Sequence, residues 1–284
     1  MTVILSLLIL WSLILIFMLL WGLLSSLKTY NDFRKNLFGL PQQWMFSNYA
    51  TALSKLYVVV ADPNGGNTRI YIEGLLFNSL FYTLLAAFGS VFVPMITAYV
   101  TAKWPRWWSS RLIFWIVIFC MTIPIIGNMS SELEMTMKIG LYDTLVVGPF
   151  LKSSFLGMYF LIFYENFKRL NAGVTEAALI DGANQFQIMF RICVPMVMNL
   201  VGVMYVLNVI GIWNDYQTPL LYFPSHPTLA LGIYMFQVST DTELATAPIQ
   251  FASAYLMLLP VLLVFIVFRN KIIGKLAISD GIKG

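Results

Sequence analysis

The chain offers few side chains that could make or break covalent bonds. Its only histidine, His226, lies between Ser225 and Pro227, and one histidine cannot hold a metal ion by itself. The two cysteines, Cys120 and Cys193, have no metal-ligand spacing. The sequence also lacks a G-x-x-x-x-G-K-[ST] phosphate loop, an H-E-x-x-H zinc motif and a G-x-S-x-G nucleophile turn. We therefore expect no catalytic residue, no metal site, no bound cofactor and no P-loop ATP hydrolysis in this chain.

The small residues between Glu176 and Ala183 indicate a surface that contacts another protein. If Thr175 caps a helix, Glu176 falls in its first turn, where a negative charge complements the helix dipole. Glycine inside a helix costs about 1 kcal/mol relative to alanine, so Gly182 needs a reason such as a turn or a close contact. Small side chains let another backbone approach.

Pro195 is expected to open the next apolar span, where its missing N–H is harmless. A push on the short helix would then move a rigid span. These residues alone leave an ordinary amphipathic helix at the membrane surface as an alternative. The residues that we assign to the contact surface are Glu176, Ala177, Ala178, Asp181, Gly182, Ala183 and Pro195.

Composition places the chain in a lipid bilayer. Hydrophobic residues make up 59% and charged residues 11% of the chain, and the mean hydropathy is +0.79; soluble domains carry about 25% charged residues. Apolar segments that approach the length needed to cross the hydrocarbon core are residues 3–27, 75–102, 112–127, 145–164, 195–213 and 249–268. We predict an all-α polytopic membrane protein, a single transmembrane domain over residues 1–284 with about six transmembrane helices.

Basic residues predict the orientation, because lysine and arginine favour cytoplasmic loops. With six spans, one side carries Lys103, Arg106, Arg111, Lys168, Arg169, Arg191, Arg269, Lys271, Lys275 and Lys283. The opposite side carries Glu132, Glu134 and Asp143 against Lys138 in a short loop. We therefore expect both termini, the loop at residues 174–190 and the tail at residues 269–284 in the cytoplasm.

The longest spaced pattern joins Glu-Ala-Ala, three residues, Gly, nine residues, Ile, and a proline three positions later. The matching residues are Glu176, Ala177, Ala178, Gly182, Ile192 and Pro195. This pattern resembles the signature of the membrane subunits of binding-protein-dependent ABC importers, with Val194 where the signature has leucine. In that family the loop forms a coupling helix that docks on a separate ATPase subunit. The resemblance implies that role for residues 176–183, between the fourth and fifth spans.

Shorter patterns resemble the carbohydrate branch of the family. They are Trp44 with Phe46-Ser47-Asn48-Tyr49, and Trp213-Asn214-Asp215 followed by Pro219. The chain ends in Gly281, Ile282, Lys283 and Gly284, similar to the second membrane subunit of maltose importers, whose tail reaches the ATPases.

The resemblance implies a permease subunit in a prokaryotic plasma or inner membrane that takes up a sugar or oligosaccharide. The implied partners are a homologous second membrane subunit, two ATPase subunits that bind ATP and Mg²⁺, and an external solute-binding protein. No nucleic-acid partner is expected.

Polar residues on the fifth span suggest a substrate path. Helical spacing places Tyr205, Asn208, Ile212 and Asp215 on one broad face, next to Trp213 and Asn214. An aromatic ring and hydrogen-bonding groups suit a sugar, although asparagines also join packed transmembrane helices. Lys152 either lines this path or extends outward to the membrane surface.

Two rival functions remain open. The same architecture would serve an amino acid, a peptide or a polyol. An ion-coupled secondary transporter would need buried carboxylates, and only Asp215, near a span end, is available.

Overall fold

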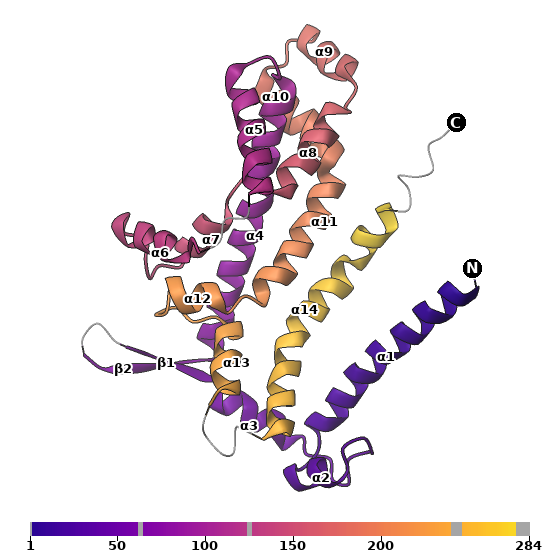
Figure 1. Ribbon diagram of the computed structural model, residues 1–284, viewed down its shortest axis with the longest axis vertical. Helices are drawn as coiled ribbons and strands as arrows, with labels where there is room; N and C mark the ends of the chain where they lie inside the picture. The colour runs from indigo at the N-terminus through magenta and orange to yellow at the C-terminus, as the bar shows by residue number, and fades with distance from the viewer. Residues whose placement is uncertain (1, 62–64, 124–126, 240–245, 277–284) are drawn as a thin grey trace. The chain divides into compact units, whose positions relative to one another are not determined.

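The computed structural model describes residues 2–61, 65–123, 127–239 and 246–276, and these residues are mostly helical (Figure 1). The chain divides into two compact units. The first combines Met1–Phe77 with Pro227–Val264, and the second combines Asn78–His226 with Phe265–Gly284. Helices α4 (Ile72–Lys103) and α14 (Ala247–Leu276) each run from one unit into the other.

Long apolar helices dominate both units. Among the described residues, three helical segments are long and apolar enough to cross a membrane: Thr2–Ser26, Ile72–Lys103 and Gln185–Trp213. Trp108–Thr122 and Ala247–Leu263 are shorter apolar helices. These five segments overlap five of the six spans predicted from hydropathy.

The first unit contains the helices α1 (Thr2–Ser26), α2 (Tyr30–Lys35), α3 (Ser47–Lys55) and α13 (Leu229–Gln237). It also contains an antiparallel hairpin of β1 (Tyr57–Ala61) and β2 (Asn67–Tyr71), in which Tyr57 lies opposite Tyr71. The all-α prediction therefore needs a correction: the fold is mostly helical with one hairpin. The run Val58-Val59-Val60 explains the strand, because β-branched residues favour extended backbone.

The second unit contains the remaining helices. They are α5 (Trp108–Thr122), α6 (Met129–Lys138), α7 (Val147–Lys152), α8 (Met158–Lys168), α9 (Ala172–Ile180), α10 (Gln185–Ile188), the π-helix η1 (Met189–Cys193), α11 (Val194–Trp213) and α12 (Gln217–Tyr222). Helices α9 and α10 lie at one end of this unit, whereas α6 and α12 lie toward the other end (Figure 1).

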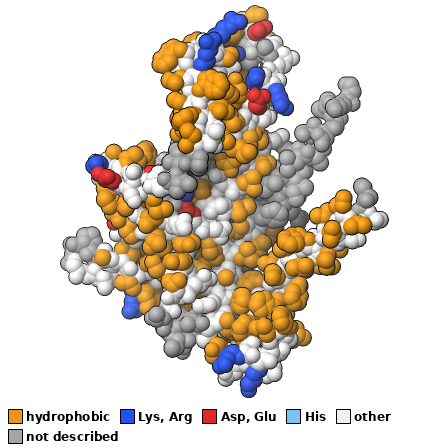
Figure 2. Space-filling model, viewed as in Figure 1, with side chains coloured by type: hydrophobic (Ala, Val, Ile, Leu, Met, Phe, Trp, Pro, Cys, Tyr) orange, Lys and Arg blue, Asp and Glu red, His pale blue; other side chains and the backbone are white. Residues whose placement is uncertain are grey.

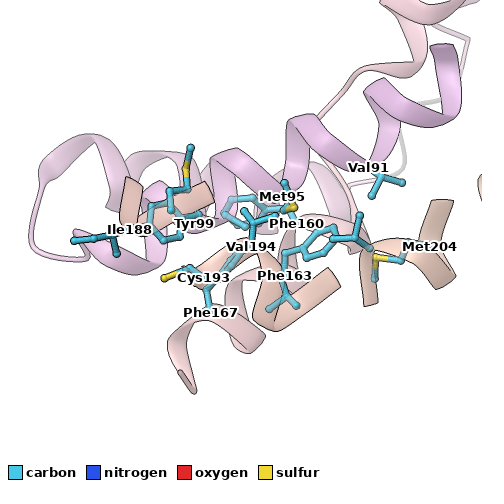
Figure 3. Packing of buried hydrophobic residues seen from close by; sticks show 14 of the residues in the cluster. Val91, Met95, Tyr99, Phe160, Phe163, Phe167, Ile188, Cys193, Val194 and Met204 are labelled. Atoms are coloured by element: carbon cyan, nitrogen blue, oxygen red, sulfur yellow. The ribbon is translucent and has the colours of Figure 1, made fainter. Parts of the chain in front are cut away.

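One hydrophobic cluster joins the long helices α4, α8 and α11 of the second unit (Figure 3). Its buried members repeat at helical spacing on α4 (Val91, Met95, Ala98, Tyr99), α8 (Phe160, Phe163, Phe167) and α11 (Val194, Val197, Val201, Met204). Spacings of three and four residues place each set on one helix face, so three faces share one core. Ala178 of α9 and Ile188 of α10 join the same cluster, which fixes the short helices onto the long ones.

The predicted fourth span, residues 145–164, is not one continuous helix. It divides into α7 and α8, separated by residues 153–157. The local residues explain the break: the Ser153 hydroxyl donates to the Pro149 carbonyl at 2.6 Å, and Gly157 has extended backbone with φ 173°. A Cβ at Gly89 of α4 would overlap the Ser153 hydroxyl, so glycine lets the broken segment approach α4 closely.

The surface of the chain is largely apolar. On α1, the side chains of residues 3–20 are exposed, and Trp11 is 63% exposed. A helix that is hydrophobic all round and exposed in the isolated chain requires lipid or a partner around it. Figure 2 shows hydrophobic side chains over much of the visible surface, with lysine and arginine gathered at the end of the second unit where α9 lies.

Candidate functional site

Helix α9 begins earlier than the sequence suggested. Asn171 is its N-cap, and the Asn171 side chain accepts a hydrogen bond from the Gly173 backbone N–H at 2.9 Å. The prediction that Thr175 caps this helix is therefore wrong, and Glu176 lies in the second turn. Asparagine is at least as good an N-cap as threonine, so the earlier cap prevails.

Gly182 lies just past the C-terminus of α9, not inside the helix. Its φ is +85°, in the left-handed region. The Ala183 N–H donates to the Ala178 carbonyl at 2.9 Å, and the Gly182 N–H donates to the Leu179 carbonyl at 3.1 Å. These two bonds form a Schellman motif, which satisfies the last helix carbonyls. Of the two reasons that we expected for this glycine, the turn is confirmed.

The next helix starts immediately after this turn. Asn184 and Gln187 form a capping box, with the Asn184 side chain accepting from the Gln187 N–H at 2.9 Å. The helical path then continues through α10 and η1 into α11. Pro195 lies in the first two positions of α11, as expected, although the helical path through α10 and η1 already begins at Gln185. Proline has no N–H to donate to the Arg191 carbonyl four residues earlier, and the five-residue π-helix that contains Arg191 ends at Cys193, two residues before Pro195.

One side of α9 is seated on the core. Thr175 is 7% exposed and Ala178 is 9% exposed, and the two lie three residues apart on one helix face. The Lys103 ammonium of α4 donates to the Thr175 hydroxyl oxygen at 3.0 Å. Helix α9 therefore cannot shift without disturbing α4 and the shared cluster.

The other side of α9 and the start of α10 are exposed. Ile180 is 86% exposed, Phe186 73% and Leu179 43%, and Phe186 stacks on Phe190 with ring centroids 6.3 Å apart. The predicted residues Glu176, Ala177, Asp181 and Gly182 are exposed as well, and Ala183 is half-buried. The result is a rigidly held surface with apolar centres and acidic neighbours, suited to a protein partner.

A cavity of about 530 Å³ lies beside the non-helical residues that separate α7 from α8. Its lining includes Asn208 and Ile212 of α11, Ser90 of α4, Lys152 and Tyr159. Asn208 donates from its side-chain amide to the Met204 carbonyl of its own helix at 2.9 Å, which leaves the amide oxygen as an acceptor. Two of the predicted path residues therefore meet in a cavity that holds hydroxyl, amide and aromatic groups.

Asp215 does not line this cavity but holds Lys152 at its edge. Its Oδ2 accepts from Lys152 Nζ at 2.9 Å, from the Tyr82 hydroxyl at 2.9 Å and from the Thr218 hydroxyl at 2.6 Å. Its Oδ1 accepts from the Thr218 backbone N–H at 3.0 Å. Burial raises the pKa of Asp215, but the Thr218 hydrogen bonds and the Lys152 ammonium outweigh burial and hold this pKa below its usual value.

The other predicted path residues lie elsewhere. Tyr205 donates a long hydrogen bond of 3.4 Å to the Leu84 carbonyl, Trp213 is buried, and Asn214 bonds back to the Ile210 carbonyl at 2.8 Å. Ser90 and Tyr159 also line the cavity and were not among the predicted residues. Ser90 carried a usable signal, because a polar residue in the middle of an apolar span commonly faces a cavity or a neighbouring helix.

Comparison with known proteins identifies the family. Residues 90–273 match the family described as "Binding-protein-dependent transport system inner membrane component". The chain belongs to this family. The match covers the cavity, α9, the turn at Gly182 and α11.

Several relatives of this chain are named as permeases. The diacetylchitobiose uptake system permease protein NgcG of Streptomyces coelicolor is 28% identical over 277 residues, covering 96% of this chain and 86% of the relative. The arabinooligosaccharides transport system permease protein AraQ of Bacillus subtilis is 27% identical, covering 96% and 92%. A chain in the crystal structure of a bacterial ABC transporter that imports the acidic polysaccharide alginate matches with a TM-score of 0.75, 22% identity and 94% coverage of both chains, which shows a shared fold.

Two further predictions concern the C-terminal tail of the chain and the absence of a metal site. The predicted tail contacts, Gly281 to Gly284, lie outside the described residues. Within the described ranges, no group of three or more histidine, cysteine, aspartate or glutamate side chains is placed to hold a metal ion. His226 lies with its Nδ1 3.9 Å from Asp143 Oδ1.

Proposed function

We propose that this chain is the membrane subunit of an ATP-driven importer that takes up sugars or oligosaccharides delivered by an extracytoplasmic solute-binding protein. Membership of the binding-protein-dependent family supports the importer, and the sugar-named permeases among its relatives support the cargo. The observation that carries the proposal is the α9–α10 surface, which is exposed yet firmly seated on α4 and α11.

The proposed coupling runs through this surface. An ATPase subunit docks on the exposed side of α9, and ATP and Mg²⁺ bind on the ATPases, not on this chain. Movement of α9 passes to α4 through the Lys103–Thr175 hydrogen bond and to α11 through the continuous path from Gln185. In the complete assembly a homologous membrane subunit pairs with this chain, and two ATPase subunits drive the pair.

The proposed cargo path includes the cavity beside Asn208. Lys152 is the cation in its lining, and its pairing with Asp215 neutralises the positive charge. Ser90, Asn208 and Tyr159 then provide neutral hydrogen-bonding groups and an aromatic surface. Such a lining suits an uncharged sugar, which offers hydroxyl groups and flat C–H faces. A non-sugar solute carried by the same architecture is the alternative, and an ion-coupled carrier is disfavoured because Asp215 is committed to Lys152.

The proposed location is the cell membrane, crossed several times, with both termini in the cytoplasm. The five apolar helical segments support several crossings. Lys103, Arg106, Lys168 and Arg169 flank α9 in the sequence or in the fold, which supports a cytoplasmic position for this end.

The test is reconstitution of the chain in liposomes with its companion membrane, ATPase and solute-binding subunits. Uptake of labelled oligosaccharides is measured with ATP and with a non-hydrolysable ATP analogue, against labelled amino acids and peptides. We expect ATP-dependent uptake of a sugar. Uptake of only an amino acid or peptide would favour the alternative cargo, and uptake that follows an ion gradient without ATP would overturn the importer proposal.

A further inference from the structure

A second cavity, of about 220 Å³, lies directly behind α9. It is lined by side chains from α4, α8, α9 and η1, including Tyr99, Lys103, Phe167, Lys168, Thr175 and Cys193. Figure 3 shows Tyr99, Phe167 and Cys193 together at the Ile188 end of the hydrophobic cluster. This cavity is separate from the proposed cargo path, because the two share no lining residue.

The Tyr99 hydroxyl is an unusual feature of this cavity. Tyr99 is only 4% exposed, and among the described residues its buried hydroxyl has the Cys193 sulfur beside it but no hydrogen bond of ordinary geometry. A buried hydroxyl loses its hydrogen bonds to water, and a thiol sulfur is only a weak acceptor in return, so the burial costs free energy. A ligand that accepts a hydrogen bond inside the cavity would remove this cost.

Two lysines make the same cavity positive. Lys103 is half-buried and donates to the Thr175 hydroxyl oxygen at 3.0 Å, which uses one of the three N–H groups of its ammonium. Within the described part of the chain, no carboxylate lies within ion-pair distance of Lys103. Lys168 approaches Glu165 only at 3.7 Å, with both side chains about half exposed or more, so this pair is weak.

We propose that this cavity binds a phosphate-class oxyanion, either inorganic phosphate or the phosphate of an anionic lipid headgroup. Such a group accepts hydrogen bonds from the Tyr99 hydroxyl and the Lys103 ammonium, and Lys168 adds positive charge from the rim. Water would satisfy the hydroxyl but would leave the Lys103 ammonium without a counter-ion among the described residues. The lining of donors and cations with no described carboxylate selects an anion over a cation.

The site has a consequence for α9. The oxyanion would bind beside the Lys103–Thr175 hydrogen bond that seats α9 on α4, and so would stabilise the seated position. This consequence rests on the proposed coupling function, whereas binding of the oxyanion does not.

The binding test uses the full chain purified in an uncharged detergent. Binding of radiolabelled inorganic phosphate is measured by equilibrium dialysis, and retained phosphatidylglycerol is counted by native mass spectrometry. Wild type is compared with Tyr99→Phe, Lys103→Gln and a control, Lys138→Gln, whose lysine lies on α6 and pairs with Glu134. We expect about 10-fold weaker binding in Lys103→Gln and about 3-fold to 10-fold weaker binding in Tyr99→Phe, with no change in the control.

The two arms identify the source of the ligand. Phosphate binding without lipid would identify a soluble oxyanion, and site-dependent retention of phosphatidylglycerol alone would identify a headgroup. Equal binding by wild type and both cavity variants, or no binding of either probe to wild type, would overturn the proposal. Tyr99→Phe removes a single oxygen atom, and gel filtration verifies that it folds. Failure of sugar uptake in reconstituted liposomes would leave this result standing, so the two proposals fail separately.

Discussion

Gly182 holds the turn after α9 in a backbone conformation that most residues adopt only with strain. Apart from its chain neighbours, no atom of the described residues lies within 4 Å of the position that a Cβ would take, so conformation and not space decides what is tolerated. Gly182→Val should destabilise the turn by about 1–2 kcal/mol, because a β-branched residue is strained at φ +85°. We expect uptake per inserted molecule to fall at least about 10-fold, measured in cells with the amount of membrane protein quantified.

The matched control for this change is Gly182→Asn. Asparagine adopts the left-handed region far more readily than valine and also occurs at this helix-end position. Uptake should therefore stay close to that of wild type. Equal loss in both variants would mean that the surface needs a bare backbone for contact, and normal uptake in both would count against the coupling role.

Asp215 gathers three donors on one oxygen, and its charge should stabilise the fold. Asp215→Asn should lower the free energy of unfolding by about 1–3 kcal/mol, because hydrogen bonds to a charged group are lost and Lys152 loses its counter-ion. The pKa of Asp215 is lowered in the fold. Its contribution is therefore complete above the unfolded pKa of about 3.9 and is lost as the pH falls through the lower folded pKa.

The measurement is Tm in detergent for wild type and Asp215→Asn across pH. The difference should stay constant between about pH 5 and pH 8 and shrink below about pH 4. The double variant Lys152→Met/Asp215→Asn serves as the control and should recover part of the loss, since neither charge is left unpaired. A single variant as stable as wild type at pH 7 would contradict this account.

The sequence predicts the role of a single residue where the groups that it contacts are close to it in the chain. Gly182 was recognised as needing a special reason, and the Schellman turn provides it. Asn171, directly before α9, is a strong N-cap type, so the sequence itself carries the signal for the earlier helix start. The Lys152–Asp215 pair joins residues far apart in the chain, and no local pattern indicates it.

At the scale of elements, hydropathy predicted the long helices because it averages over many residues. The same averaging hid the break between α7 and α8, where Ser153 and Gly157 interrupt an otherwise apolar stretch. The cavity beside Asn208 exists because of this break, so it could not be predicted from a set of continuous spans. The small elements α2, α3 and the hairpin also fell inside what hydropathy treats as one long loop.

The exposed face of α9 gives a prediction that belongs to this helix as a whole. Ile180 is 86% exposed and contributes little to the chain's own packing, so Ile180→Glu should leave Tm nearly unchanged. The same change should weaken ATPase-subunit binding by at least about 2 kcal/mol, roughly 30-fold, because it places a charge at the centre of an apolar contact.

Binding is measured by titrating labelled ATPase subunits onto the solubilised membrane subunits. Leu40→Glu is the control, since Leu40 is 67% exposed and receives the same chemical change in the first unit. ATPase affinity that falls equally in both variants would point to a general effect of charge. Unchanged affinity in Ile180→Glu would remove α9 from the docking surface.

At the scale of the molecule, the fold places basic and acidic residues of the second unit at opposite ends, which bears on the orientation of the chain in the membrane. Lys103, Arg106 and Lys168 belong to the α9 end of the second unit, where Lys103 bonds to Thr175. Toward the other end, Glu132 of α6 accepts from the Tyr222 hydroxyl at 3.1 Å, and Asp143 accepts from the Ser225 N–H at 2.8 Å. Basic residues near one end and acidic residues near the other predict that the α9 end faces the cytoplasm.

Single cysteines test this orientation in intact cells. In a background with Cys120 and Cys193 replaced by serine, Arg106→Cys and Lys138→Cys each place one thiol at an exposed position, the first before α5 and the second at the end of α6. A membrane-impermeant thiol reagent should label Lys138→Cys from outside intact cells and Arg106→Cys only in inverted vesicles. The reverse pattern would place α9 on the outer side, where no ATPase can reach it, and the coupling proposal would fail with the orientation. Labelling of both from outside would show that the second unit does not carry its two ends on opposite sides of the membrane.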